Sequence, residues 1–256
     1  MRKLTLILIT MLLFAGSKAV YASLPFGEGR GGVETLEYKL YFNWQFVWLN
    51  AGTATMTTRE QTYQGKPSYR CSLVTRTSQK IDKYFRMRDT LICNVNKEFQ
   101  PLYYRKGANE GDRYYVDELF YSYDRNGAKV TMKALTSKGE HKTQQHQSKY
   151  YVYDMLSFFL RARTFDPTNW KPGYTYVFPI VDANHIKNAK LRFRGRSTVK
   201  AENGKKYKCL ELSYIETEKN KDKEIVRFYV TDDKQHIPVR LDLFLKFGTA
   251  KAFLKN

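Results

Sequence analysis

The 256-residue sequence lacks several features by which proteins reveal their chemistry. It holds no Gly-x-Ser-x-Gly nucleophile elbow, no glycine-rich phosphate loop before a helix and no His-Glu-x-x-His zinc motif. Cysteine is scarce, with 3 residues, and no Cys-x-x-Cys or paired Cys/His spacing indicates zinc. These absences favour a non-catalytic protein without cofactor or metal, although they leave enzyme activity open.

No apolar run reaches the roughly 20 residues that cross a bilayer as a helix. The nearest is Leu4–Gly16, which follows the basic Met1–Lys3 and precedes Val20–Ala22, a small-residue cleavage pattern. We therefore expect residues 1–22 to be a removable signal peptide and residues 23–256 to form one exported, β-rich domain, in the periplasm or associated with the envelope. An uncleaved anchor or a buried N-terminal element is the alternative.

Acidic residues are few, 25 against 44 lysines and arginines, so the net charge is +19. Loss of Arg2, Lys3 and Lys18 with the signal peptide leaves +16 on the mature chain. Such a surface attracts polyanions. In a bacterial envelope these are anionic lipid, glycolipid or polysaccharide, whereas nucleic acid is excluded by the compartment. The alternative is that the charge serves solubility alone.

Aromatic residues are plentiful, with 20 tyrosines and 16 phenylalanines, and they favour strands. The segment from Leu36 to Leu49 alternates with a period of two, which predicts one unusually long strand with a strongly aromatic face. The run 51–58 continues or pairs with it, and Gly52 predicts a bend or bulge. The candidate apolar binding face on this strand comprises Phe42, Trp44, Phe46 and Trp48.

Extended runs recur through the rest of the chain. They cover 68–78, 86–95, 114–123, 129–136, 174–181, 190–200, 207–216, 224–231 and 238–247. Asn126-Gly127 predicts a tight hairpin between two of them, because it accepts positive φ. The runs that carry Cys71 and Cys93 would fold back around residue 82, which makes these cysteines a candidate disulfide; the alternative is that they are small buried hydrophobes.

One segment, 151–163, has the apolar spacing of a helix. Asp154 near its start and the arginines near its end suit the helix dipole, and Pro167 and Pro172 prevent its continuation. Since this helix is apolar on several sides, it must be covered. We therefore expect a mainly β fold, a long curved antiparallel sheet, open or half-barrel, packed around one central α-helix.

Four cations occupy alternate positions late in the chain. In a strand, Lys190, Arg192, Arg194 and Arg196 would share one face, while Leu191 and Phe193 face the other way. Guanidinium groups bind phosphate and carboxylate in a fork, so this basic stripe is a candidate site for an anionic group. The alternative is a solvated face whose charges are offset by neighbouring acids, with Glu211 and Glu216 available on the next strand.

Several motifs together resemble a known family. They are the aromatic segment ending in Ala51-Gly52-Thr53-Ala54, the stretch from Tyr153 to Arg161, Gly173, the run 207–212, and the C-terminal segments 228–233, 237–240 and 248–250. This set is similar to the exported bacterial family of unknown function known as domain of unknown function 3108, over nearly all of residues 23–256. The resemblance implies long curved antiparallel strands and carries no catalytic residue or cofactor.

Two main functions remain. The first is a binding or carrier module for an amphipathic or anionic envelope ligand, which would show an apolar cavity without a converging acid–base pair. The second is an exported enzyme acting on cell-envelope polymer, which needs polar groups that meet in one cleft. A structural partner in an assembly is a third alternative. The first agrees best with the missing catalytic motifs.

Overall fold

The computed structural model describes residues 32–44, 47–182, 185–218, 220–245 and 248–255. The predicted signal peptide and Phe46 lie outside these ranges. The strands are β1 Val33–Trp44, β2 Val47–Tyr63, β3 Lys66–Thr77, β4 Arg88–Asn96, β5 Pro101–Glu110, β6 Arg113–Asp124, β7 Gly127–Leu135, β8 His141–Ser148, β9 Thr175–Asp182, β10 His185–Lys200, β11 Lys206–Glu218, β12 Lys221–Thr231, β13 Pro238–Leu245 and β14 Gly248–Leu254. The helices are α1 Gln79–Asp82 and α2 Met155–Ala162.

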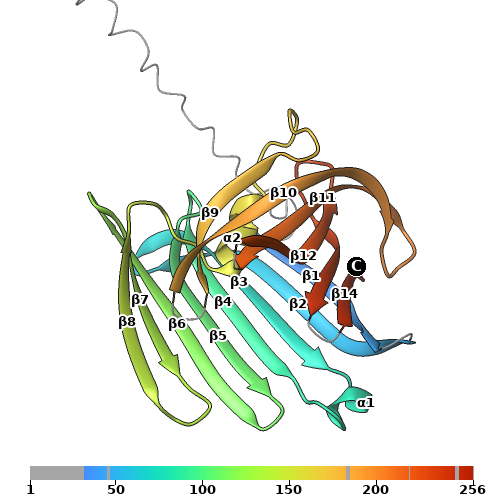
Figure 1. The fold of residues 1–256 in the computed structure, drawn as a ribbon, viewed down its shortest axis with the longest axis horizontal. Helices are drawn as coiled ribbons and strands as arrows, with labels where there is room; N and C mark the ends of the chain where they lie inside the picture. The colour runs from blue at the N-terminus through green and yellow to red at the C-terminus, as the bar shows by residue number, and fades with distance from the viewer. Residues whose placement is uncertain (1–31, 45–46, 183–184, 219, 246–247, 256) are drawn as a thin grey trace, which may run out of the picture.

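All these strands belong to one antiparallel sheet of 14 strands. Its order is β8-β7-β6-β5-β4-β3-β2-β1-β14-β13-β12-β11-β10-β9, so the C-terminal hairpins continue the sheet from β1. The sheet curves, and β9–β12 arch over α2, which lies inside the curve (Figure 1). The two edge strands, β8 and β9, are not paired with each other. The predicted curved, open antiparallel sheet is therefore confirmed.

The segment that joins β8 to α2 links the two edges. Tyr153 pairs in parallel with Ile180 of β9, and Val152 is fully buried against β6 and β7. Val181 of β9 packs against the same cluster. The crossing segment therefore connects the two edges of the sheet, although β8 and β9 form no hydrogen-bonded ladder with each other.

Each extended run predicted from the sequence corresponds to a strand, with shifts of a few residues at the ends. One prediction was wrong: the segment from Leu36 to Leu49 is two strands, because the chain reverses between Trp44 and Val47. A β-bulge interrupts the β1–β2 ladder where Leu40 faces Gly52 and Tyr41 faces Asn50. Gly52 is required there, since a Cβ would lie 2.0 Å from the Arg76 carbonyl oxygen.

Three strands, β5, β8 and β14, were not predicted. All side chains of β8 are exposed or half-buried, so this edge strand has no alternating apolar face to detect. Helix α2 is shorter than the predicted 151–163, because Asp154 caps it at its start. Among the described residues no helix is long and apolar enough to cross a bilayer.

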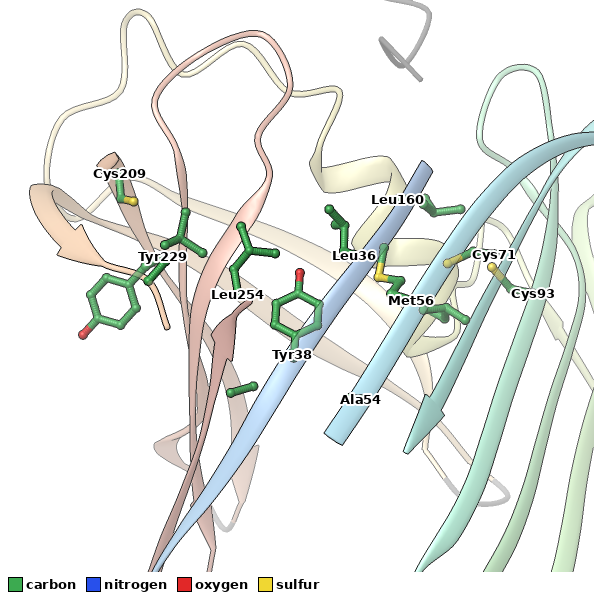
Figure 2. Packing of buried hydrophobic residues seen from close by; sticks show 14 of the residues in the cluster. Leu36, Tyr38, Ala54, Met56, Cys71, Cys93, Leu160, Cys209, Tyr229 and Leu254 are labelled. Atoms are coloured by element: carbon green, nitrogen blue, oxygen red, sulfur yellow. The ribbon is translucent and has the colours of Figure 1, made fainter. Parts of the chain in front are cut away.

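The largest core lies between α2 and the concave face of the sheet. Leu36 and Tyr38 of β1, Met56 of β2 and Leu160 of α2 meet in it (Figure 2). The buried Tyr38 hydroxyl donates a hydrogen bond to the Pro238 carbonyl. Burial at roughly 25 cal/mol per Å² of apolar surface is the main force that holds α2 against the sheet.

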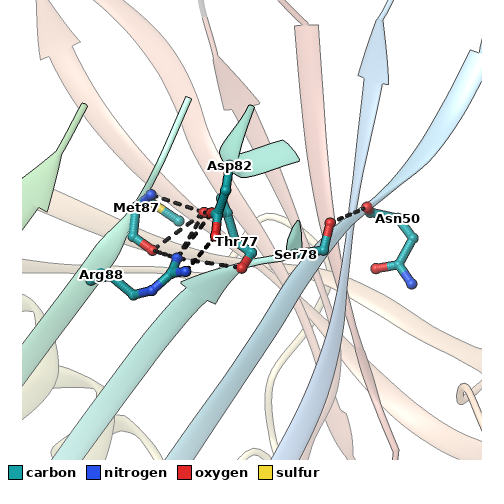
Figure 3. Close-up of polar contacts among 6 residues, drawn as sticks. All are labelled: Asn50, Thr77, Ser78, Asp82, Met87 and Arg88. Carbon is teal, nitrogen blue, oxygen red and sulfur yellow. Dashed lines mark hydrogen bonds and ion pairs between the residues drawn. The ribbon is translucent and has the colours of Figure 1, made fainter. Parts of the chain in front are cut away.

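A cluster of polar contacts holds the connection between β3 and β4, which contains α1. Arg88 pairs with Asp82 of α1, whose carboxylate also accepts a hydrogen bond from the Thr77 hydroxyl (Figure 3). The Arg88 guanidinium beside Asp82 lowers the pKa of that carboxyl. Ser78 bonds to the Asn50 carbonyl and so attaches this connection to β2.

Candidate functional site

An apolar cleft lies between α2, the segment after it and strands β10–β12. Aromatic rings dominate its walls, and they come from Phe158, Phe159, Phe165, Trp170, Tyr214 and Phe228. The cleft has about 40 Å³ of free volume. Arg163 and His236 are the basic side chains among the described residues that line it. We call this hollow the apolar cleft.

The sequence positions α2 through a capping box. The Asp154 carboxylate accepts hydrogen bonds from the backbone N–H groups of Leu156 and Ser157, and Ser157 Oγ accepts one from the Asp154 N–H. The Tyr121 hydroxyl of β6 also donates to Asp154. Burial raises the pKa of the Asp154 carboxyl to about 6, although these hydrogen bonds oppose the rise. A buried titratable group therefore fixes the start of the helix.

A buried ion pair fixes the other end of α2. Both guanidinium NH₂ groups of Arg163 bond to the Glu34 carboxylate of β1, at 2.6 and 2.9 Å. Arg163 also donates to the Gln235 carbonyl, and its own carbonyl contacts His236 Nδ1. The Arg163 guanidinium and His236 Nδ1 are thus committed to structural contacts. They do not converge as an acid–base pair, which is the arrangement that catalysis needs.

The segment 164–174 covers the outer side of the apolar cleft. Phe165 and Trp170 of this segment contact each other at 6.1 Å between ring centroids, and Trp170 reaches Phe193 of β10. Its other backbone hydrogen bonds are local, whereas two join it to the sheet: Gly173 N–H donates to the Phe193 carbonyl, and Phe193 N–H donates to the Tyr174 carbonyl. These two bonds, and the Arg196 bond to the Pro167 carbonyl, would break if the segment lifted.

The predicted basic stripe is offset by acidic residues two strands away. Lys190 and Arg192 both pair with Asp222, at 2.6 and 3.0 Å, and Arg194 lies 3.6 Å from Glu224. The pKa of Asp222 is lowered to about 2, first by the Lys190 bond. The acids come from β12 and not from Glu211 or Glu216 of β11, the partners expected from the sequence.

Arg196 does not share the face of the other three cations, and this part of the prediction was wrong. A β-bulge at Gly195, which has a φ of +138°, shifts the register of β10. Arg196 consequently lies 5.4 Å from the ring centroid of the core residue Phe193 and pairs with Asp232.

Of the predicted apolar face on the first strand, Phe42 and Trp48 do not line the apolar cleft. Phe42 faces Leu49 across the β1–β2 hairpin, whereas Trp48 faces Asn43 and therefore points to the other side. Trp48 is 41% exposed and lies under the Lys251 ammonium group. The backbone of Trp44 ends β1, and the position of its side chain lies outside the described residues, as Phe46 does. The expectation that these aromatic residues line one face is therefore wrong for Trp48.

Cys71 and Cys93 are direct partners in the β3–β4 ladder, and both are fully buried (Figure 2). Their thiols are free in the structure. Burial raises the pKa of the Cys93 thiol well above its usual range. The opposed positions agree with the expected geometry, and the bond itself stays a prediction.

Comparison with known proteins supports the family resemblance. The family model described as protein of unknown function DUF3108 matches residues 37–255. The chain belongs to this family. No curated protein matches this DUF3108 member. The crystal structure of a beta-barrel-like protein of domain of unknown function DUF1849 from Brucella abortus is similar to it, with a TM-score of 0.52 and 10% identity, over 89% of this chain and 97% of that one. At this identity the likeness concerns the fold alone.

Proposed function

We propose that this DUF3108 protein is a binding or carrier module, and that the apolar part of an amphipathic envelope molecule occupies the apolar cleft. The lining of the cleft carries this proposal. Apart from Arg163, whose guanidinium binds Glu34, and His236, whose Nδ1 contacts the Arg163 carbonyl, its described side chains are apolar or aromatic. Such a lining favours transfer of an apolar group from water and supplies no converging catalytic groups.

The free volume of about 40 Å³ admits only a few atoms in the present conformation. An acyl chain therefore needs the segment 164–174 to lift away from β10. This movement would break the two backbone hydrogen bonds that join the segment to Phe193 of β10 and leave its local bonds intact. In this proposal the segment closes again after binding, and the rings of Phe165 and Trp170 then pack against the bound acyl chain.

Charge and export complete the proposal. The net charge of +19, or +16 without residues 1–22, favours a ligand with an anionic head group. The sequence pattern of residues 1–22 supports export to the periplasm or envelope, where anionic lipids and glycolipids are available. The role inferred is therefore to hold an amphipathic, anionic envelope molecule, with no reaction performed on it.

The test is titration of the protein with a fluorescent fatty acid, followed by competition with unlabelled fatty acid. The variant Ala162→Phe places a ring in the apolar cleft, since Ala162 lines it from the end of α2. We expect saturable binding to the native protein and at least about tenfold weaker binding to the variant. Ala134→Phe on β7, another half-buried alanine, is the control.

Saturable binding that both phenylalanine variants preserve would place the probe elsewhere and contradict the proposal. Mass spectrometry under native conditions adds a second measurement. A lipid that copurifies with the native protein, and is depleted in Ala162→Phe, supports the same site.

A further inference from the structure

A second hollow lies at the edge of the sheet, where the crossing segment from β8 to α2 meets β9. Tyr150, Tyr151 and Tyr153 of the crossing segment line it together with Tyr176 of β9 and Asn188 of β10. Its volume is about 380 Å³. We call this hollow the tyrosine trough. It is separate from the apolar cleft, and no residue of the stripe lines it.

The sequence explains why the trough exists. Tyr153 donates its N–H to the Pro179 carbonyl and accepts from the Val181 N–H, as in a parallel ladder. The next step of that ladder would pair Tyr151 with the Val177 carbonyl and the Pro179 N–H, but proline has no N–H. The crossing segment therefore leaves β9 at this point, and the gap between the two is the trough.

The trough offers flat aromatic faces beside free hydrogen-bonding groups. Tyr150 is 72% exposed and Tyr151 is 48% exposed. The backbone N–H and C=O of Val177 point away from β10, as those of Pro179 and Val181 do, and neither has a partner among the described residues. The Asn188 amide adds a donor and an acceptor. Stacking on the rings and hydrogen bonding at the rim are thus available to one ligand.

No charged side chain is among the described residues that line the trough, and Arg161 lies outside this lining, near Tyr153. Burial raises the pKa of Tyr153 to about 12, and the nearby positive charge of Arg161 opposes this rise. Arg161 makes no ion pair with a described residue; it lies 5.7 Å from the ring centroid of Phe165 and contacts Thr164 Oγ1. It differs in this from the stripe cations, each of which has a carboxylate partner.

These properties select a ligand class. An added peptide strand is disfavoured, because Pro179 offers no donor at the edge where such a strand would pair. An acyl chain is disfavoured because the trough is open to water and rimmed by free polar groups. A sugar ring has an apolar face for a tyrosine ring and hydroxyl groups for the rim, and an acidic group on it complements Arg161.

We propose that the tyrosine trough binds an acidic oligosaccharide, with pyranose rings stacked on Tyr150 and Tyr151 and an anionic substituent directed toward Arg161. This site does not depend on the apolar cleft. A polysaccharide or the sugar part of a glycolipid carries the same chemistry.

The experiment uses an array of oligosaccharides without acyl chains, in which acidic pyranose chains are matched with neutral ones. Titration calorimetry with the strongest acidic binder follows. We expect acidic chains to bind better than their neutral counterparts, and Tyr150→Ala with Tyr151→Ala to weaken binding by about tenfold or more. Arg161→Gln should lower the affinity for acidic oligosaccharides to that for the matched neutral ones.

Exposed tyrosines elsewhere provide the matched control. Tyr84 is 83% exposed and Tyr114 is 51% exposed, so Tyr84→Ala with Tyr114→Ala removes the same number of rings far from the trough. This control should bind within about twofold of the native protein, and Tyr150→Phe with Tyr151→Phe should retain the stacking.

The proposal is overturned if no acidic chain on the array binds, if the alanine double variant at the trough binds like the native protein, or if the control loses as much affinity. Equal binding of acidic and neutral chains overturns the role of Arg161. Because the probes have no acyl chain and the fatty-acid titration has no sugar, failure of either site is distinguishable from failure of the other.

Discussion

The inner side of the sheet beneath α2 and the outer side of β10–β12 both carry paired charges, in very different surroundings. Arg163 and Glu34 meet on the inner side with side chains 2% and 14% exposed. On the outer side, Lys190 and Asp222 meet with side chains 28% and 34% exposed. Water solvates the outer charges when they separate, whereas the inner ones have no such alternative. An ion pair therefore holds the end of α2 on the inner side, whereas an ion pair on the outer side contributes little to the stability of the fold.

Breaking the inner pair should have the largest effect. Glu34→Gln keeps the shape of the side chain and removes the carboxylate charge that the buried Arg163 guanidinium binds at 2.6 and 2.9 Å. We expect the free energy of unfolding to fall by about 3–5 kcal/mol, measured by urea denaturation. The control is Glu37→Gln on the same strand, whose partner Lys255 is exposed. Its loss should stay below about 1 kcal/mol.

Equal losses of unfolding free energy in Glu34→Gln and Glu37→Gln would contradict the claim that the buried ion pair contributes more stability than an exposed one. A second arm separates charge from packing. Glu34→Leu combined with Arg163→Met replaces both members of the pair by apolar groups, so no charge remains buried. This double variant should recover most of the stability that Glu34→Gln loses.

The sequence predicted the strands well and the site poorly, for a physical reason. The alternation of apolar and polar residues is a pattern between near neighbours in the sequence, so it was enough to predict β6, β7 and β10–β13. Phe165 and Trp170 form part of the apolar cleft. They lie in a segment without helical or strand periodicity, and only the folded chain brings them close to the sheet. The alternate spacing of like charges placed Lys190, Arg192 and Arg194 on one face but failed at Arg196, beyond the bulge. The acids that pair with the three cations lie on β12, and residue spacing says nothing about a partner two strands away.

The tyrosine trough was not predictable for the same reason. Its cause is the missing N–H of Pro179, which matters only because Tyr153 pairs beside it. Pairing between residues this far apart in the sequence leaves no local signal. Only Pro179 itself was visible in the sequence, inside the predicted run 174–181, and a proline inside a strand indicates an edge strand.

A second test of the inner side concerns Asp154 and pH. Its folded-state pKa of about 6 exceeds the ordinary value of 3.8, so the folded protein binds this proton more tightly than the unfolded chain. The associated stability, about 3 kcal/mol, is complete below pH 3.8 and is lost as the pH rises through 6. Asp154→Asn keeps the N-cap and cannot ionise. Relative to this variant, the native protein should lose stability between about pH 4 and pH 7.

The measurement is the difference in unfolding free energy between native protein and Asp154→Asn at a series of pH values. Titration of groups that both proteins share cancels in this difference. A difference that stays constant across the series would show that burial does not perturb this carboxyl.

A third inner feature, the cysteine pair, should have a somewhat smaller effect. Cys71 and Cys93 face each other in the ladder, so a disulfide oxidant can join them once the strands fold. The bond would close a loop of about 20 residues and stabilise the protein by about 3 kcal/mol or less. Mass spectrometry of unreduced peptides should show the two cysteines linked and Cys209 free. A native protein that keeps all its thiols under a disulfide oxidant would contradict this prediction.

The smallest effect is expected on the outer side. Asp222→Asn removes the acid shared by Lys190 and Arg192, and it should leave the free energy of unfolding almost unchanged, because the pair is solvated. The two released cations should, however, increase retention on a sulfated polysaccharide column. The control, Asp112→Asn, removes the same charge from an exposed aspartate that makes no ion pair with a described residue. If both variants are retained equally, retention follows net charge alone, and the stripe is an ordinary solvated face rather than a latent anion site.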